Sequence, residues 1–220
     1  MHSNGDYIAL LDGDDYWTDD KKLQKQIDFL ENNNTFVGCC HKVSCVDAAG
    51  NDLEMFLQHD TGTLGFQDFN LLDILKKNPI PSLSVVFRNP RMSTFPPWFY
   101  KTYMADWPLH IINAQRGKFR YFDDVMGAYR IHGAGAWSEH RDNAALVLEA
   151  EVSVWELIVK DPEFSKYHEY IIELLKINYM SLHKKYMREK KLKKSMEYVS
   201  MFENINSERV SVWVIKARMR

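Results

Sequence analysis

The chain has 220 residues, of which 45% are hydrophobic and 26% charged, a composition that excludes a disordered or low-complexity protein and suits a domain with a buried core. The formal net charge is −2, with 13 Lys and Arg against 18 Asp and Glu in residues 1–140 and 15 against 12 in residues 141–220. An acidic N-terminal part suits a cation site better than a nucleic-acid groove, so we expect no nucleic-acid partner.

The first predicted element is a short buried strand, Tyr7–Leu11, which ends in the acidic loop Asp12-Gly13-Asp14-Asp15. A helix follows, capped by Thr18 or Asp19, and it places Leu23, Ile27 and Leu30 on one apolar face. The pattern then predicts a strand over 36–46, a helix over 66–77, a strand over 82–87, an irregular segment over 91–103, a helix over 108–116 and a strand pair over 119–130.

The three cysteines, Cys39, Cys40 and Cys45, lie in the second predicted strand. An odd number, with two adjacent, is not typical of a secreted disulfide framework. Adjacent strand residues point to opposite faces, so Cys39, Cys40 and His41 do not suit one zinc ion, and we expect buried free thiols. No apolar run reaches the roughly 18 residues of a membrane span, and no signal-peptide pattern opens the chain. We expect a cytoplasmic protein.

From residue 143 the pattern changes to three strongly helical stretches, over 144–159, 163–185 and 190–202. We place a boundary near residue 140, with an α/β domain over 1–140 and an all-helical extension over 141–220. A strand buried on both faces needs neighbours in its sheet. Two explanations remain open for the first strand: later strands flank it, or preceding βαβ units are missing from the sequence.

The acidic loop is the strongest local signal. Asp12, Asp14 and Asp15 repel one another unless a cation or a hydrogen-bonding ligand offsets their charge. Oxygen ligands favour Mg²⁺ or Mn²⁺, and Mg²⁺ is commonly held by one or two carboxylates together with substrate phosphates. The alternative interpretation is a helix entry whose acids complement the helix dipole, which is the role we expect of Asp19 and Asp20.

Residues 5–17 (GDYIALLDGDDYW), followed by 22–26 (KLQKQ) and Phe29-Leu30, closely resemble family 2 glycosyltransferases of the GT-A fold. The resemblance covers residues 5–140. It implies a Rossmann-like α/β domain with a mixed sheet, of which residues 1–140 are the C-terminal part that holds metal and acceptor. By position, it assigns Asp12 to the nucleotide ribose and Asp14 to the metal on the diphosphate, with Asp15 as a neighbour on the cofactor side.

Later segments carry the resemblance further. Residues 84–88 look like the family strand that precedes the acceptor region. Asp106 matches the second member of an acidic pair, which in the family is the general base. Residues 129–132 (YRIH), followed by Gly133, Gly135 and Ser138, are similar to the segment that closes over the donor, and they imply His132 as a ligand of the metal or diphosphate. Asp106 also has a structural interpretation, compatible with the first, as a helix N-cap with a proline near N1.

Two departures from the family matter. The N-terminal strands that bind the nucleotide base in the family have no counterpart, so we expect an N-terminally truncated domain. The Gln-x-x-Arg-Trp signature of processive members is missing from the sequence, which favours a non-processive enzyme.

The sequence thus predicts an inverting glycosyltransferase that moves a sugar from a nucleotide-diphosphate donor to the hydroxyl of a carbohydrate or lipid-linked acceptor, in cell-surface polysaccharide or glycoconjugate synthesis. Such a reaction needs a cation, Mn²⁺ or Mg²⁺, for the departing diphosphate and a carboxylate base for the acceptor proton. Three alternatives are an inactive fragment whose exposed sheet edge favours self-association, a helical interaction module, and a nucleotidyltransferase. The last would need a Gly-rich phosphate loop that the sequence lacks.

Two further patterns allow more than one interpretation. The basic run Lys184–Lys194 suits contact with anionic lipid at the inner face of a membrane, or a solvated helix face. A group of aromatic side chains suits stacking on an acceptor sugar, or ordinary packing; it comprises Phe95, Trp98, Phe99, Tyr100, Tyr103 and Trp107. We expect His59 and Asp60 to lie in an exposed loop.

Overall fold

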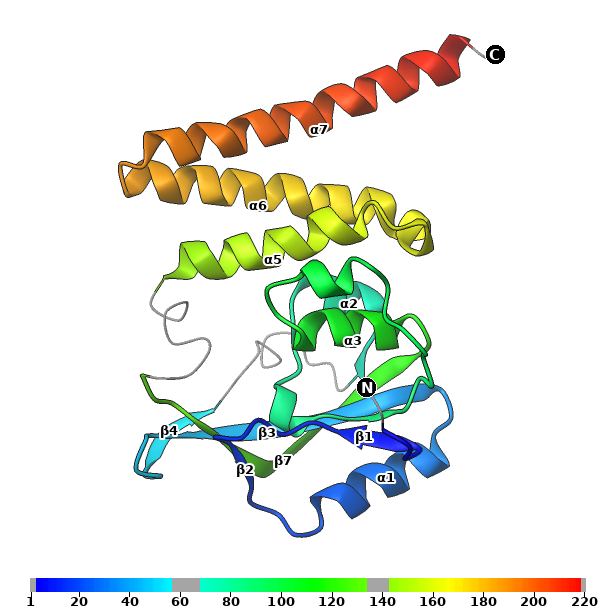
Figure 1. Ribbon diagram of the computed structural model, residues 1–220, viewed down its shortest axis with the longest axis vertical. Coiled ribbons are helices and arrows are strands. Elements are labelled where there is room, and N and C mark those ends of the chain that lie inside the picture. The colour runs from blue at the N-terminus through cyan, green and yellow to red at the C-terminus, as the bar shows by residue number, and fades with distance from the viewer. Residues whose placement is uncertain (1–2, 57–67, 134–142, 219–220) are drawn as a thin grey trace. The chain divides into compact units, whose positions relative to one another are not determined.

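The computed structural model describes residues 3–56, 68–133 and 143–218, with side chains up to residue 205 (Figure 1). The chain divides into two compact units. The first comprises Met1–Tyr100 and Met104–Ala136, and the second comprises Lys101–Tyr103 and Trp137–Arg220.

The first unit is built on a seven-stranded mixed sheet with the order β1-β6-β3-β7-β2, in which β4 also pairs with β3 and β5 with β7. β3 and β7 run parallel over a long register, and the other described pairs are antiparallel. The strands are β1 Tyr7–Ala9, β2 Tyr16–Trp17, β3 Phe36–Val46, β4 Asp52–Phe56, β5 Asp68–Phe69, β6 Val86–Arg88 and β7 Lys118–Arg130.

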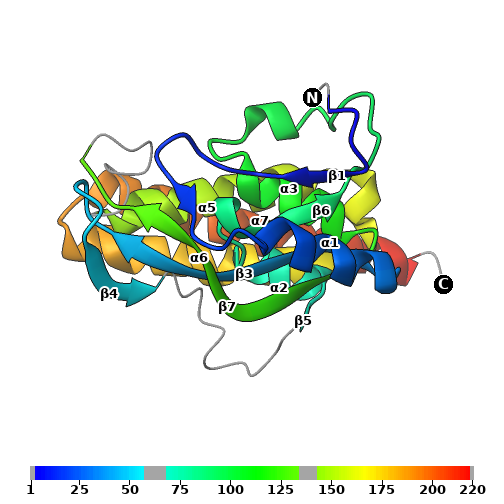
Figure 2. The same ribbon diagram turned by 90° about the horizontal axis from the view of Figure 1, so that it is seen from below.

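Helices cover both faces of this sheet. Helix α1 (Lys22–Asn32) lies on one face, and α2 (Leu71–Lys76) and α3 (Asp106–Ala114) lie on the other (Figure 1). Figure 2, seen from the α1 side, shows β3 and β7 crossing the middle of the unit. Because β3 is covered on both sides, its residues are almost all buried, including the three cysteines, which are free thiols. The expected α/β fold with a mixed sheet is confirmed.

Close packing at the centre of the sheet depends on one glycine. A Cβ atom added to Gly38 on β3 would lie 2.4 Å from the ring of Phe119 and 3.0 Å from Phe87. Both phenylalanines are fully buried. Only a residue without a side chain therefore lets the rings of β6 and β7 close over β3.

Several expected elements differ from those observed. β1 is a short, partly exposed strand that pairs antiparallel with β6, so the expectation of a buried strand over 7–11 is wrong. One of the two explanations left open for the first strand was that later strands flank it, and β6 does so. Residues 82–84 form a 3-10 turn, and the strand begins only at Val86. Residues 118–130 form one continuous strand rather than a pair, and the helix expected over 66–77 is only six residues long, capped by Asn70.

The buried face of α1 agrees with the prediction at Leu30 and differs from it at Leu23. Its buried residues are Lys22, Gln26 and Leu30, while Leu23 is 37% exposed. Gln26 Nε2 donates to the carbonyl of Cys39 at 3.1 Å and to that of Ser84 at 2.9 Å. Gln26 is buried on this face because it supplies donors to two backbone carbonyl groups.

The start of α1 also differs from the prediction. Lys21 is the N-cap and makes no side-chain capping bond, and the first turn holds no acid. Asp19 instead accepts from the backbone N–H of Lys21 and pairs with Lys25 at 2.8 Å. Lys22 Nζ lies 4.4 Å from the ring centroid of Trp17, and burial lowers the pKa of Lys22 to about 8.

The second unit is helical, as expected for this end of the chain. It contains α5 (Ala144–Ile158), a 3-10 turn (Pro162–Tyr167), α6 (His168–Arg188) and α7 (Leu192–Arg218). α6 lies between α5 and α7 and contacts both (Figure 1). α7 is longer than the predicted 190–202. In the part of the chain that is described, no helix combines the length and apolar character that a membrane crossing requires.

Candidate functional site

The acidic loop lies between β1 and β2. Its turn is closed by a hydrogen bond from the backbone N–H of Asp15 to the carbonyl of Asp12 at 3.2 Å. The following Tyr16 and Trp17 pair with Ala128 and Gly127 of β7. This pairing brings the loop to the C-terminal end of β7, which is the end of a sheet strand where ligands commonly bind in open α/β folds.

Arg130, the last residue of β7, connects the loop to the rest of the sheet. Its Nε donates to the carbonyl of Asp14 at 3.0 Å, and its Nη1 donates to the carbonyls of Asp47 and Ala48 at 3.3 and 3.1 Å. The guanidinium carbon lies 5.5 Å from the ring centroid of Tyr16. A planar cation with several donors is suited to bridging separate carbonyl groups. Arg130 therefore holds the acidic loop against the turn between β3 and β4.

Asp14 and His132 face each other at this end of the sheet. His132 Nε2 lies 2.8 Å from Asp14 Oδ2, and the side chains are 22% and 41% exposed. The hydrogen bond from His132 lowers the pKa of Asp14 below its ordinary value. The result is an ionised carboxylate paired with an imidazole, and both side chains are partly exposed.

Asp15 has a different environment. Its Oδ1 accepts from the backbone N–H of Arg130 at 2.9 Å, and its Oδ2 is buried without a hydrogen-bond partner among the described residues. Burial raises the pKa of Asp15 to about 6. Asp15 thus points into the protein and ties the loop to β7, while Asp14 points outward.

Asp106 acts electrostatically on Asp12 although the two residues are far apart in sequence. The pKa of Asp12 is raised by burial and, secondarily, by the charges of Asp14 and Asp106. Asp106 Oδ2 accepts a hydrogen bond from Asn78 Nδ2 at 2.9 Å. The N-cap of α3 is Ala105, so the interpretation of Asp106 as an N-cap is wrong, and the helix proline is its third residue.

The structure thus gathers Asp12, Asp14, Asp15 and His132 at one end of the sheet, with Asp106 close enough to act on Asp12. Gly135, Ser138, His59 and Asp60 lie outside the described residues. Sequence reasoning missed the roles of Arg130 and Asn78. Arg130 stood next to His132 in a recognised motif, but nothing in the sequence indicated that it binds three carbonyl groups.

A cation held by the described residues at this site would need further ligands. No group of three or more His, Cys, Asp and Glu side chains able to hold a metal ion occurs among residues 3–56, 68–133 and 143–205. Asp14 and His132 offer a carboxylate and an imidazole, both accessible. Mg²⁺ and Mn²⁺ are commonly held by one or two carboxylates while phosphate oxygens and water complete the shell. The pair therefore fits a cation that arrives with a diphosphate.

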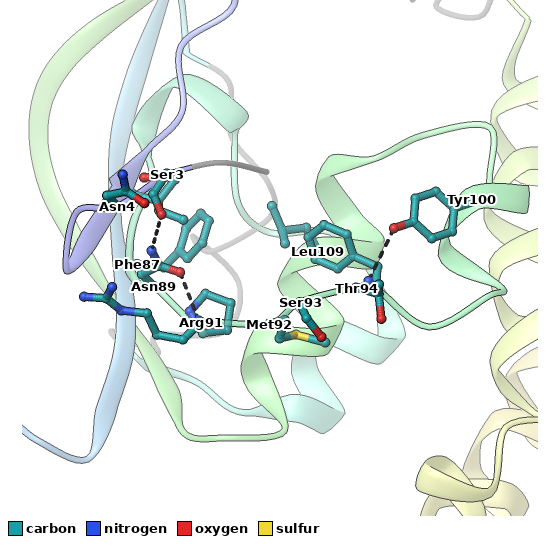
Figure 3. Close-up of a pocket in the computed structure, with 13 residues that line it drawn as sticks. Ser3, Asn4, Phe87, Asn89, Arg91, Met92, Ser93, Thr94, Tyr100 and Leu109 are labelled. Carbon is teal, nitrogen blue, oxygen red and sulfur yellow. Dashed lines mark hydrogen bonds between the residues drawn. The ribbon is translucent and has the colours of Figure 1, made fainter.

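A pocket of about 260 Å³ lies beside β6 and α3 (Figure 3). Asn89 and Arg91 lie on one side of it, and Thr94, Tyr100 and Leu109 lie on the other. None of the candidate site residues lines it. It adjoins the site only through α3, because Leu109 follows Asp106 by about one helical turn.

The aromatic group divides between the two interpretations that the sequence left open. Trp98 and Trp107 are buried, and Trp107 Nε1 donates to the carbonyl of Ile74 at 2.6 Å, so both serve packing. Phe95 stacks on Phe99 with ring centroids 4.3 Å apart. Tyr100 is 68% exposed and lines the pocket, which leaves its ring able to contact a ligand.

The contacts of Arg130 predict the effect of Arg130→Lys. A single ammonium group cannot reproduce three carbonyl contacts from two nitrogens, so we expect the acidic loop to loosen and metal–nucleotide affinity to fall by about 10- to 100-fold. Hydrogen exchange of the amides in residues 12–16 should accelerate. Arg120→Lys serves as the control, because Arg120 lies on the same strand but pairs with Asp68. It should change neither the metal–nucleotide affinity nor the hydrogen exchange of residues 12–16. Unchanged exchange in the loop of Arg130→Lys would show that Arg130 does not position it.

The sheet, its helices and the acid-bearing loop at the strand ends define an α/β domain of the GT-A type. Residues 1–92 match the family model described as "Glycosyl transferase family 2".

Three curated mycobacterial proteins are similar to the chain. They are "Uncharacterized protein Rv1520" and "Uncharacterized protein MT1570" of Mycobacterium tuberculosis and "Uncharacterized protein Mb1547" of Mycobacterium bovis. Each is 32% identical over 136 residues, which make up 61% of this chain and 37% of the relative. The chain therefore spans little more than a third of the length of the relatives that it matches.

Proposed function

We propose that the protein is an inverting glycosyltransferase, which transfers a sugar from a nucleoside diphosphate to an acceptor hydroxyl in the synthesis of a cell-surface polysaccharide or glycoconjugate. The match of residues 1–92 to the glycosyltransferase family model supports the general activity. The inverting course, the donor and the acceptor are part of the proposal.

Asp14 and His132 are the proposed ligands of Mn²⁺ or Mg²⁺, and Asp12, with Asp15 behind it, is the proposed contact of the nucleotide. The cation, when bound, neutralises the charge that develops on the departing diphosphate. The ionised state of Asp14 and the exposure of both ligands support this assignment. Asp15 and Arg130 keep the loop in place from the protein side.

Asp106 is the proposed general base. It takes the proton of the acceptor hydroxyl while that oxygen bonds to the anomeric carbon and the bond from this carbon to the diphosphate breaks. The hydrogen bond from Asn78 holds one carboxylate oxygen and leaves the other for the acceptor. Inversion requires the base to lie on the sugar face opposite the diphosphate.

One observation carries the proposal: acids from two separate segments and a histidine from a third act on one another. The loop acids Asp12 and Asp14, His132 after β7, and Asp106 on α3 are far apart in sequence, yet Asp14 bonds to His132 and Asp106 raises the pKa of Asp12. Clustered acids cost free energy unless a ligand makes use of them.

Isothermal titration calorimetry on the 220-residue chain tests the proposal. UDP, GDP, dTDP and CMP are titrated with Mn²⁺ and again with EDTA. We expect saturable binding of one nucleotide class that requires Mn²⁺, and slow hydrolysis of its sugar conjugate, in which water replaces the acceptor and the nucleotide is released. Binding that is equal with Mn²⁺ and with EDTA would contradict the cation role of the site.

A further inference from the structure

The turn that joins α6 to α7 presents a compact exposed surface, here called the basic tip and defined as residues 184–196. α6 ends at Arg188 and α7 begins at Leu192. The turn is tight: Lys190 adopts a positive φ of 60°, and the N–H of Lys191 donates to the carbonyl of Tyr186 at 2.9 Å. Residues 187–194 are all exposed. In Figure 1 the tip is the connection from yellow to orange at one end of the hairpin.

Positive charge dominates this tip. Residues 184–194 contain seven Lys and Arg and one acid, Glu189. Lys191 pairs with Glu189 at 2.8 Å and Lys194 with Glu149 at 3.1 Å. The other five cations have no carboxylate within ion-pair distance among the described residues; they are Lys184, Lys185, Arg188, Lys190 and Lys193. Their charge is therefore available to an external anionic surface.

Apolar side chains are exposed among these cations. Met187 is 46% exposed, and Leu192 and Met196 are each 61% exposed. Leu192 and Met196 are four residues apart on α7, so they lie on one helix face. A purely solvated helix face, which is one interpretation of the basic run, gives no reason for three large apolar side chains at its centre.

We propose that the basic tip docks onto a bilayer that contains anionic lipids. Cations near such a surface are attracted to the lipid headgroups, while neighbouring Met and Leu side chains enter the interface between headgroups and acyl chains. A nucleic acid would use the cations alone. The combination of unpaired cations with exposed apolar groups favours lipid, and it does not depend on the proposed transferase activity.

Co-sedimentation of the full 220-residue chain with vesicles tests the proposal. We expect binding to phosphatidylcholine vesicles that contain phosphatidylglycerol, no binding to phosphatidylcholine alone, and weaker binding as salt is raised. Each cation near an anionic surface contributes about fivefold to the affinity for vesicles. The double variant Lys190→Gln with Lys193→Gln should therefore weaken binding by roughly 25-fold. The matched control, Lys76→Gln with Lys77→Gln, removes the same charge from exposed positions on the first unit and should leave binding unchanged.

A second variant separates lipid insertion from simple charge attraction. Leu192→Ser with Met196→Ser keeps every charge and should weaken vesicle binding by roughly tenfold. Circular dichroism checks that both tip variants keep their helices. The proposal is overturned if the serine variant binds vesicles as well as the original chain, if the control lowers binding as much as the tip variant, or if the tip binds duplex DNA in place of vesicles.

Discussion

Asp106→Asn is expected to lower the rate of sugar transfer by about 10²- to 10⁴-fold, the usual contribution of a general base. An asparagine side chain has nearly the same shape, and its carbonyl oxygen still accepts the hydrogen bond from Asn78. The variant therefore loses the ability to take a proton without losing its place in the site. The measurement is kcat and KM with the donor identified by calorimetry, together with the nucleotide affinity of the variant.

The same variant should bind the nucleotide with Mn²⁺ about as well as the original protein. Asp106 acts on the acceptor, and removing its charge relieves repulsion at Asp12. Asp123→Asn is the control, since Asp123 is an acid whose side chain is 84% exposed. If Asp106→Asn retained most of the turnover, or lost nucleotide affinity and turnover in parallel, the base assignment would be wrong.

Asp14→Asn is expected to remove the dependence of nucleotide binding on Mn²⁺ and to weaken nucleotide affinity by about 10²-fold or more. An amide is a much poorer ligand than a carboxylate for a hard cation, and within the described residues His132 is the only other proposed ligand. Calorimetric titration of the nucleotide with Mn²⁺ measures the loss directly. Thermal unfolding should change little, because the pair with His132 is partly exposed and the amide still offers it a hydrogen bond.

Asp20→Asn provides the comparison for Asp14→Asn. Asp20 is an exposed acid in the same stretch of chain and makes no ion pair within the described residues. The Asp20→Asn variant should bind nucleotide and Mn²⁺ like the original protein. Equal losses in the two variants would mean that general negative charge, rather than a ligand at Asp14, governs affinity.

Local patterns carried much of what could be predicted. The acidic loop after an apolar run, the buried strand over 36–46 and the helical character of the C-terminal part follow from residue periodicity and turn chemistry, which act over a few neighbouring residues. These signals were sufficient for the α/β class and for the acidic cluster of Asp12, Asp14 and Asp15, whereas Asp106 and His132 became candidates only through the resemblance to family 2 glycosyltransferases. The metal, nucleotide and base roles of these residues remain predictions.

Long-range contacts decided the rest, because they depend on how strands pair and on which side chains meet after folding. Sequence periodicity correctly placed Leu30 on the buried face of α1, but it did not predict Gln26 there, which donates to the carbonyl groups of Cys39 and Ser84. Nothing local indicates that Arg130 spans three carbonyl groups or that Asn78 holds Asp106. The sequence by itself determined which chemical groups the site contains, and only the tertiary structure decided which of them meet, since each contact joins segments that are distant along the chain.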